Sequence, residues 1–143
     1  MINVRHETTI RLYKMLFFKK NVGRIGEDLT VKHLKTLGFS ILERNFLKPF
    51  GEIDIIAKKG SSIHFVEVKT VTVSDDVSRG TDVYEPEDNV HSWKLTRLNK
   101  TIQSYLLEKG IDEDKNDYQL DLITVYLDKG QKLVKIEYLD NVF

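Results

Sequence analysis

Residues 51–70, GEIDIIAKKGSSIHFVEVKT, have the pattern of two β-strands joined by a tight turn. Both halves are rich in Ile, Val and Phe, which fit the half-buried surface of a sheet. Gly60-Ser61 between them is typical of a two-residue hairpin loop. This loop, or a four-residue loop, predicts four facing pairs: Lys59–Ser62, Ile56–Phe65, Asp54–Glu67 and Glu52–Lys69. A three-residue loop would shift this register by one residue.

The predicted register gathers charged side chains on one face of the hairpin. Side chains alternate in direction along a strand, so Asp54, Glu67 and Lys69 share a face. Four apolar side chains point to the other face, which is the predicted core: Ile53, Ile55, Val66 and Val68. Opposed residues hold their Cβ atoms about 5 Å apart, and opposed like charges are destabilising. The acidic pair therefore needs a shared proton, the lysine or a divalent cation.

A divalent cation at this pair would form a catalytic arrangement. Mg²⁺ takes one or two carboxylates and keeps several waters. A lysine beside it could orient or activate the water that attacks a phosphodiester bond. The alternative is structural: Glu52 and Lys69 form an ordinary cross-strand ion pair, which contributes little at a surface. Asp54 and Glu67 then sit at a solvated edge without an ion.

Length and composition describe a single globular domain. The 143 residues suffice for one core, and 41% apolar with 31% charged residues is typical of soluble proteins. There is no cysteine, no signal peptide and no apolar run near the ~20 residues of a membrane helix. We therefore expect a cytoplasmic protein without a membrane partner. The formal net charge of zero argues against strong non-specific nucleic-acid binding, although a basic groove can exist on a neutral protein.

The remaining patterns predict an α/β or α+β domain over residues 22–143. Helices are expected at 23–37 and 90–109, and strands at 39–46, 118–126 and 132–139. With the central hairpin this gives the order α-β-β-β-α-β-β, a mixed central sheet flanked by helices. The strand after the second helix should lie parallel to an earlier one. Residues 71–88 are expected to form a long mobile loop that could cover the hairpin acids.

Residues 1–21 form a basic N-terminal extension. Ile10, Tyr13 and Phe17 recur at helical spacing, which predicts a short amphipathic helix. We expect this helix to pack on the domain or on a second copy in a homodimer. The alternative is an arm that binds nucleic acid or another anionic surface.

Other charged positions have two interpretations each. Glu27 falls in the first turn of the expected helix 23–37, where it complements the helix dipole, or it reaches the hairpin as a third acid. Lys94, Arg97 and Lys100 give the second helix a basic side, which is either solvated or in contact with phosphate. The four histidines lack zinc-ligand spacing, and no phosphate-binding glycine loop or serine-nucleophile motif is present.

Four sequence blocks resemble the YraN-like family: Gly23-x-x-Gly26-Glu27, Asn45, Gly51–Ala57 and Phe65–Lys69. The resemblance spans residues 23–125 and extends to the PD-(D/E)XK nuclease superfamily, which includes restriction endonucleases and archaeal Holliday junction resolvases. It implies a restriction-endonuclease-like core. Three places differ from the family pattern: Thr30 replaces a usual alanine, Gln119-Leu120-Asp121 a usual Arg-Phe-Asp, and Lys48 lies near a usual arginine.

The resemblance also implies roles for individual residues. Asp54 and Glu67 would bind Mg²⁺ or Mn²⁺, with the Val68 carbonyl as a further ligand. Lys69 would position or activate water, and Glu27 would be an accessory catalytic acid. The implied activity is that of a metal-dependent nuclease on DNA, including branched or damaged DNA. Two other functions stay open: a non-catalytic nucleic-acid-binding module, and a protein-interaction subunit whose hairpin acids are structural.

Overall fold

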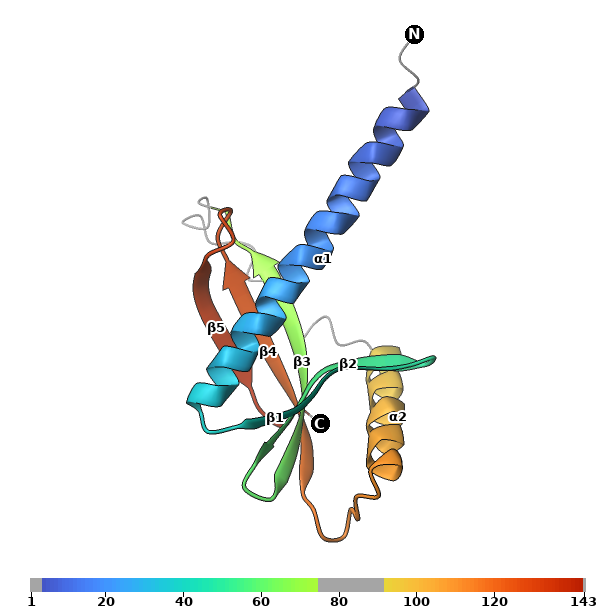
Figure 1. The fold of residues 1–143 in the computed structure, drawn as a ribbon, viewed down its shortest axis with the longest axis vertical. Helices are drawn as coiled ribbons and strands as arrows, with labels where there is room; N and C mark the ends of the chain where they lie inside the picture. Colours follow the sequence, from blue (N-terminus) through green and yellow to red (C-terminus); the bar gives the residue numbers. More distant parts are fainter. Residues whose placement is uncertain (1–3, 75–91, 143) are drawn as a thin grey trace.

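The computed structural model describes residues 4–74 and 92–142. The elements follow the predicted order and are shown in Figure 1: α1 (Val4–Thr36), β1 (Ser40–Lys48), β2 (Gly51–Lys59), β3 (Ser62–Thr72), α2 (Ser92–Glu108), β4 (Tyr118–Leu127) and β5 (Leu133–Leu139). Most of the segment 71–88, expected to be a mobile loop, lies outside the described residues.

The five strands form one mixed sheet in the order β1-β2-β3-β4-β5. The pairs β1–β2, β2–β3 and β4–β5 are antiparallel, whereas β3 and β4 are parallel, as predicted for the strand after the second helix. The chain is therefore an α+β domain with a mixed sheet. The hairpin register is confirmed, because Ile56 pairs with Phe65 and Lys59 with Ser62.

The β2–β3 ladder is shorter than expected. Its last pair is Ile55–Val66, so Asp54 and Glu67 do not form the expected backbone pair, and neither do Glu52 and Lys69. Asn45 lies opposite Asp54 in the β1–β2 ladder and has a left-handed backbone with φ of 52°. Asparagine tolerates this conformation better than most residues. The β1–β2 register shifts elsewhere, between Ile41 and Glu43, whereas β2 leaves β3 beside Asn45.

The sheet is buried on both faces, rather than on one. Ile55 and Val66 pack with Val22 and Leu34 of α1, whereas Phe65 packs with α2 residues. The prediction that Ile53 shares the face of Ile55 was wrong: Ile53 packs with Ile56 and Phe65 on the α2 side. The alternation of side chains along β2 is therefore interrupted between Ile53 and Ile55, beside the left-handed backbone of Asn45.

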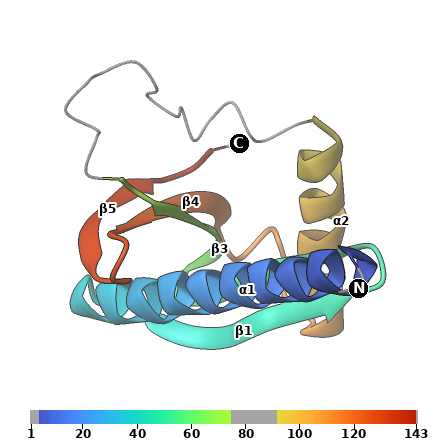
Figure 2. The same cartoon turned by 90° about the horizontal axis from the view of Figure 1, so that it is seen from above.

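Helix α1 is a single helix that continues through the expected boundary between residues 21 and 22. Its C-terminal half lies on the sheet, and its N-terminal half projects beyond the strands (Figures 1 and 2). Four apolar side chains of the projecting half are about half exposed: Leu12 (51%), Met15 (48%), Leu16 (53%) and Phe18 (49%). Among the described residues, none of them belongs to a core cluster. The expected contacts of Ile10, Tyr13 and Phe17 lie outside the described side chains. Within residues 4–74 and 92–142, neither helix combines the length and apolar character of a membrane span.

Candidate functional site

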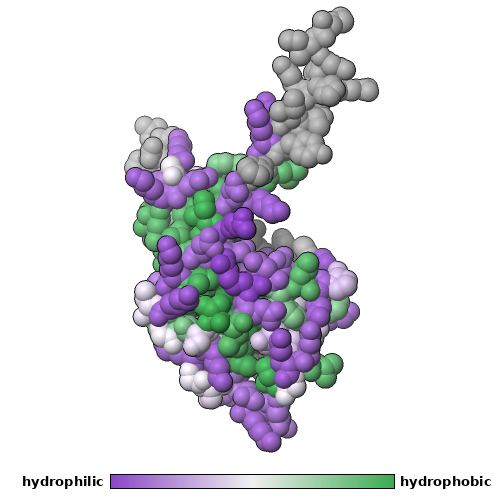
Figure 3. All heavy atoms as spheres, viewed as in Figure 1, coloured by the Kyte–Doolittle hydropathy of each residue, from purple (hydrophilic) through white to green (hydrophobic). Residues whose placement is uncertain are grey.

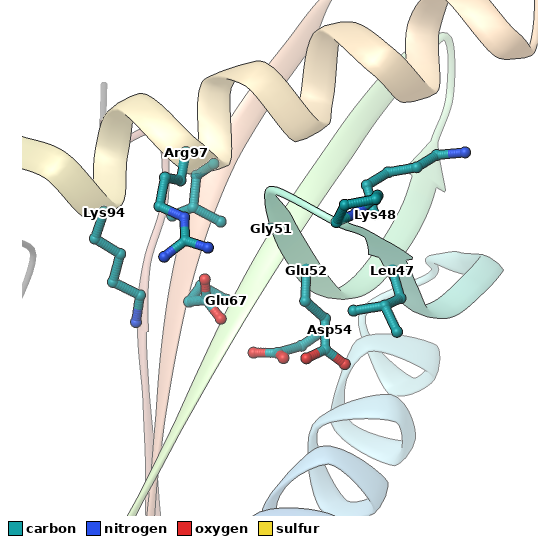
Figure 4. Close-up of a pocket in the computed structure, with 10 residues that line it drawn as sticks. Leu47, Lys48, Gly51, Glu52, Asp54, Glu67, Lys94 and Arg97 are labelled. Carbon is teal, nitrogen blue, oxygen red and sulfur yellow. The ribbon is translucent and has the colours of Figure 1, made fainter.

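Carboxyl groups from three elements converge where β2 leaves β3. Glu52 and Asp54 come from β2, Glu67 from β3 and Glu27 from α1, and the charges of Glu27, Glu52 and Glu67 all interact with that of Asp54. Figure 4 shows the side chains of Glu52, Asp54 and Glu67 lying close together. The structure thus brings together three of the four predicted catalytic residues, together with Glu52, to which sequence reasoning assigned only an ion pair.

Asp54 and Glu67 form the half-buried centre of this cluster. Asp54 Oδ2 accepts a hydrogen bond from the Val68 backbone N–H at 2.7 Å, and the Asp54 and Glu67 carboxyl groups are hydrogen-bonded to each other. Burial, together with that hydrogen bond and the charge of Asp54, raises the pKa of Glu67 to about 9. Near neutral pH, and without a cation, the pair therefore holds one proton.

The negative charge of Asp54 also acts on the two outer acids, Glu27 and Glu52. Burial and then the charge of Asp54 raise the pKa of Glu27 and that of Glu52. With its amide nitrogen turned toward them, Asn45 donates to Glu27 Oε2 and to Glu52 Oε1, both at 3.3 Å. The Arg44 guanidinium lies 3.7 Å from Glu27, but it is closer to Asp28, at 2.7 Å. The cluster consequently keeps an excess of negative charge.

Glu27 reaches the cluster because α1 approaches β3 closely. A side chain at Gly26 would overlap the Thr70 hydroxyl group, so only glycine allows this approach. Buried Thr30 donates to the Gly26 carbonyl at 2.8 Å and fills the space beside it. Since α1 begins at Val4, Glu27 lies about six turns inside the helix. The interpretation of Glu27 as a first-turn acid that complements the helix dipole was therefore wrong.

Basic side chains of α2 face the acids across a hollow of about 620 Å³. Lys94 and Arg97 extend from α2 toward Glu67 (Figure 4), and the charge of Lys94 opposes the rise in the Glu67 pKa. Arg97 Nε donates to the Phe50 carbonyl at 2.8 Å, which fixes the start of β2 against α2. Gly51 also lacks room for a Cβ there, because Thr101 of α2 lies against it. These contacts set the position of the acids on β2.

Lys69 follows Glu67 on β3 and lies near Lys94. Burial, and then the charge of Lys94, lower the pKa of Lys69. A lowered pKa increases the fraction of neutral amine, which is the form that can accept a proton. The basic character of α2 in the sequence was the only signal for Lys94 and Arg97. Their position opposite Glu67 required the fold.

The donor atoms at this site fit a hard cation with few protein ligands. Within residues 4–74 and 92–142, no group of three or more His, Cys, Asp or Glu side chains has the arrangement of a metal site. The set that remains is two carboxylates, Asp54 and Glu67. Mg²⁺ is bound in this way, by one or two carboxylates with waters completing its coordination. A cation would also replace the proton that the pair otherwise holds.

A second buried carboxyl group, Asp121, lies in the middle of β4 and is fully buried. Oδ1 accepts from Gln119 Nε2 at 2.7 Å and from the Asn141 backbone N–H at 2.9 Å, while Oδ2 accepts from the Tyr138 hydroxyl group. His64 Nδ1 lies 2.6 Å from Oδ2. Sequence reasoning missed this cluster and treated His64 as an ordinary histidine. The available signal was an aspartate inside the apolar run 118–127.

Fold and site together define a class: a small α+β domain with a mixed five-stranded sheet, whose central hairpin carries a half-buried acidic pair flanked by lysine and arginine. The model of the family described as "Uncharacterised protein family UPF0102" matches residues 26–125, and the chain belongs to this family. The resemblance to the YraN-like family is thereby confirmed at the family level.

Three relatives illustrate the similarity. A UPF0102 protein of Dictyoglomus thermophilum is 39% identical over 124 residues, which cover 87% of this chain and 98% of that protein. A UPF0102 protein of Campylobacter jejuni is 45% identical over 116 residues, covering 81% and 93%. One of Campylobacter hominis is 38% identical over 120 residues, covering 84% and 91%.

Proposed function

We propose that this chain is a metal-dependent nuclease of the PD-(D/E)XK type that hydrolyses phosphodiester bonds in DNA, with branched or damaged DNA as candidate substrates. The observation that carries the proposal is the half-buried Asp54–Glu67 pair. It is hydrogen-bonded through a proton and surrounded by further acids, and it faces basic side chains of α2. A structural ion pair would not need this excess of carboxyl groups.

The fold supports the same proposal. A restriction-endonuclease-like core would have the observed α-β-β-β-α-β order with its acids on the second and third strands. Asp54 lies on β2, and Glu67-Val68-Lys69 lie on β3. The family match contains the hairpin and both helix segments that contact it, since it covers residues 26–125.

Asp54, Glu67 and the Val68 carbonyl would hold Mg²⁺ or Mn²⁺. When bound, such a cation polarises the phosphoryl oxygen and stabilises the charge that develops in the transition state. Lys94 and Arg97 would bind the phosphate and orient it toward the acids. Lys69 would orient the attacking water or accept its proton at Nζ, while the water oxygen bonds to phosphorus. The bond to the leaving oxygen breaks, and that oxygen takes a proton from solvent. Glu27 would act as an accessory acid.

A second candidate function is a nucleic-acid-binding module that does not cleave. The pKa of Glu67 favours this candidate, because at about 9 it keeps the acidic pair protonated near neutral pH unless a cation displaces the proton. The basic residues of α2 would then still contact phosphate. The two functions differ in their response to metal.

The deciding experiment is thermal unfolding of the full chain with Mn²⁺ and with EDTA. A cation that binds only the folded state raises stability by about 2.7 kcal/mol at a hundred times its Kd. Wild type should melt higher with millimolar Mn²⁺, and Asp54→Asn should lose this response. Asp117→Asn is the matched control, because it removes an exposed acid before β4. A flat response of wild type to Mn²⁺ and Mg²⁺ would exclude the metal site and the nuclease proposal.

Lys69→Ala separates metal binding from cleavage. This variant keeps both carboxylates, so its Mn²⁺ response should survive. Its cleavage of a branched DNA substrate should fall by about a hundredfold, as for other general bases. If Lys69→Ala cleaves as fast as wild type, Lys69 has no part in the reaction.

A further inference from the structure

A second hollow lies on the α1 side of the acids. It measures about 720 Å³, and the residues that matter here are Lys19, Lys20, Arg24, Glu27 and Glu52. Glu52 also lines the hollow beside α2. The two hollows therefore meet at the carboxyl cluster, one bounded by α2 and the other by α1. Figure 3 shows hydrophilic side chains beside hydrophobic ones where the projecting half of α1 meets the rest of the domain.

The α1 side of this surface is strongly basic, although the whole chain is neutral. Residues 8–26 contain no acid, and they include five basic residues, which are Arg11, Lys14, Lys19, Lys20 and Arg24. Lys19, Lys20 and Arg24 are not in ion pairs within the described residues. Other cations of this region are neutralised, as Arg44 is by Asp28 and Lys48 by Glu108.

Helix geometry directs these cations to the site. Arg24 and Lys20 precede Glu27 by three and seven residues, so they lie on the helix face that carries Glu27 to the acids. Lys20 is about 10 Å from Glu27 along the axis, which equals the rise of about three phosphates on one strand of a duplex. A polyanion that reaches the acids along α1 would pass both side chains.

We propose that one nucleic-acid strand occupies both hollows and crosses the acids at Glu52. Lys94 and Arg97 bind its phosphates on one side, and Lys19, Lys20 and Arg24 bind them on the other. The strand continues in both directions from the acids, so recognition does not require a free end. We call the cations of both hollows the binding track. That the polymer is a nucleic acid rests on the proposed function, but binding along the track does not require cleavage.

A nucleic acid fits this surface better than an anionic membrane. The basic side chains line a hollow that also contains Glu27 and Glu52. A flat lipid surface cannot enter it and would be repelled by the acids. A single strand with spaced phosphates can follow the cations on both sides.

The test is binding of fluorescent DNA to full-length protein carrying Asp54→Asn, in EDTA, over a series of salt concentrations. The triple variant Lys19→Ala, Lys20→Ala, Arg24→Ala should bind about 10- to 100-fold more weakly at low salt. Its slope of log K against log salt should become shallower by about 2, since each phosphate contact of a single strand contributes about 0.7. The alanines keep the helix, because alanine favours it.

The matched control is Lys58→Ala, Lys129→Ala, Lys132→Ala, which removes three exposed cations outside both hollows. It should keep the slope of the Asp54→Asn protein. Equal slopes for the two triple variants would overturn the track, whatever the result of the Mn²⁺ experiment. A lost slope together with a flat Mn²⁺ response would leave the track standing and exclude the nuclease.

Two competitors sharpen the result. Closed circular single-stranded DNA should displace the probe as well as linear DNA at equal nucleotide concentration, and a need for a free end would overturn the continuous strand. Vesicles of anionic phospholipid should not displace the probe. Vesicle binding that depends on Lys19, Lys20 and Arg24, with DNA binding that does not, would assign these residues to a membrane and overturn the proposal.

Discussion

Asp121, which is fully buried, and the half-buried Asp54–Glu67 pair lie on the same sheet with opposite surroundings. Asp121 has four polar partners, from β3, β4, β5 and the segment after β5. Asp54 receives one backbone N–H, and its carboxyl neighbours are Glu27, Glu52 and Glu67. Buried charge is tolerated where donors satisfy it and is costly elsewhere. The protein thus supplies all the hydrogen-bond partners of the Asp121 carboxyl group, whereas the acidic pair depends on a proton or a cation from solution.

The largest effect is expected for Asp121→Asn. The amide nitrogen would replace an acceptor oxygen and face donors, and the charge-assisted bonds would be lost. We expect a loss of about 3 kcal/mol in the free energy of unfolding, measured with urea in EDTA. Asp117→Asn, at an exposed acid, should stay within about 0.5 kcal/mol of wild type. A change of that small size at Asp121 would mean that its hydrogen bonds do not hold the fold.

The second effect is a pH dependence of the metal-free protein. The folded-state pKa of Glu67 is raised from 4.5 to about 9, so between these values the folded chain keeps a proton that the unfolded chain has released. Stability in EDTA should therefore fall as pH rises through this range, by at most about 1.4 kcal/mol per pH unit.

Glu67→Gln tests the origin of this slope, because glutamine cannot release the proton. The variant should be less sensitive than wild type between pH 6 and about 8.5 in urea titrations with EDTA. Saturating Mn²⁺ should also oppose the fall, since the cation competes with the proton for the carboxylates. An equal slope in wild type and variant would assign the pH dependence to other groups.

The smallest effect has the opposite sign. Asp54→Asn removes the charge that repels the outer acids Glu27 and Glu52, and its amide oxygen can still accept from Val68 N–H. We expect a gain of about 1 kcal/mol in EDTA near pH 8, by the relief of this like-charge repulsion. The same substitution would then stabilise the protein at one aspartate and destabilise it at the other. Loss of stability at both positions would remove the distinction between the two sites.

Local patterns were enough to predict the order of elements and the hairpin register. The Gly60-Ser61 turn and the apolar strands fix the pairing of Ile56 with Phe65 without help from distant residues. The face of Ile53 could not be predicted in this way, because it depends on the left-handed backbone of Asn45 in the neighbouring strand. The start of α1 was also misplaced, because two separate helices were expected, one within residues 1–21 and one at 23–37, where a single helix runs from Val4 to Thr36.

The same limit applies to the sites. Asp54, Glu67, Val68 and Lys69 are close in sequence, or paired by the hairpin, so spacing and resemblance identified them. The place of Glu52 and Lys94 in the site could not be predicted, because it depends on how α1 and α2 pack around the acids. The partners of Asp121 include His64 and Tyr138, from two other strands, and no local pattern joins them.

The close contact between Gly26 and Thr70 fixes the position of α1 on the sheet and so affects where its projecting end lies. Helix α1 runs unbroken from this contact to its projecting end, and Arg11 is about 22 Å away along the axis. If the helix tilted by about 10° about this contact, its projecting end would move by about 4 Å. Glu27, one residue from the contact, would hardly move. Because glycine has no side chain, Gly26 thus sets the direction in which the N-terminal end of α1 projects.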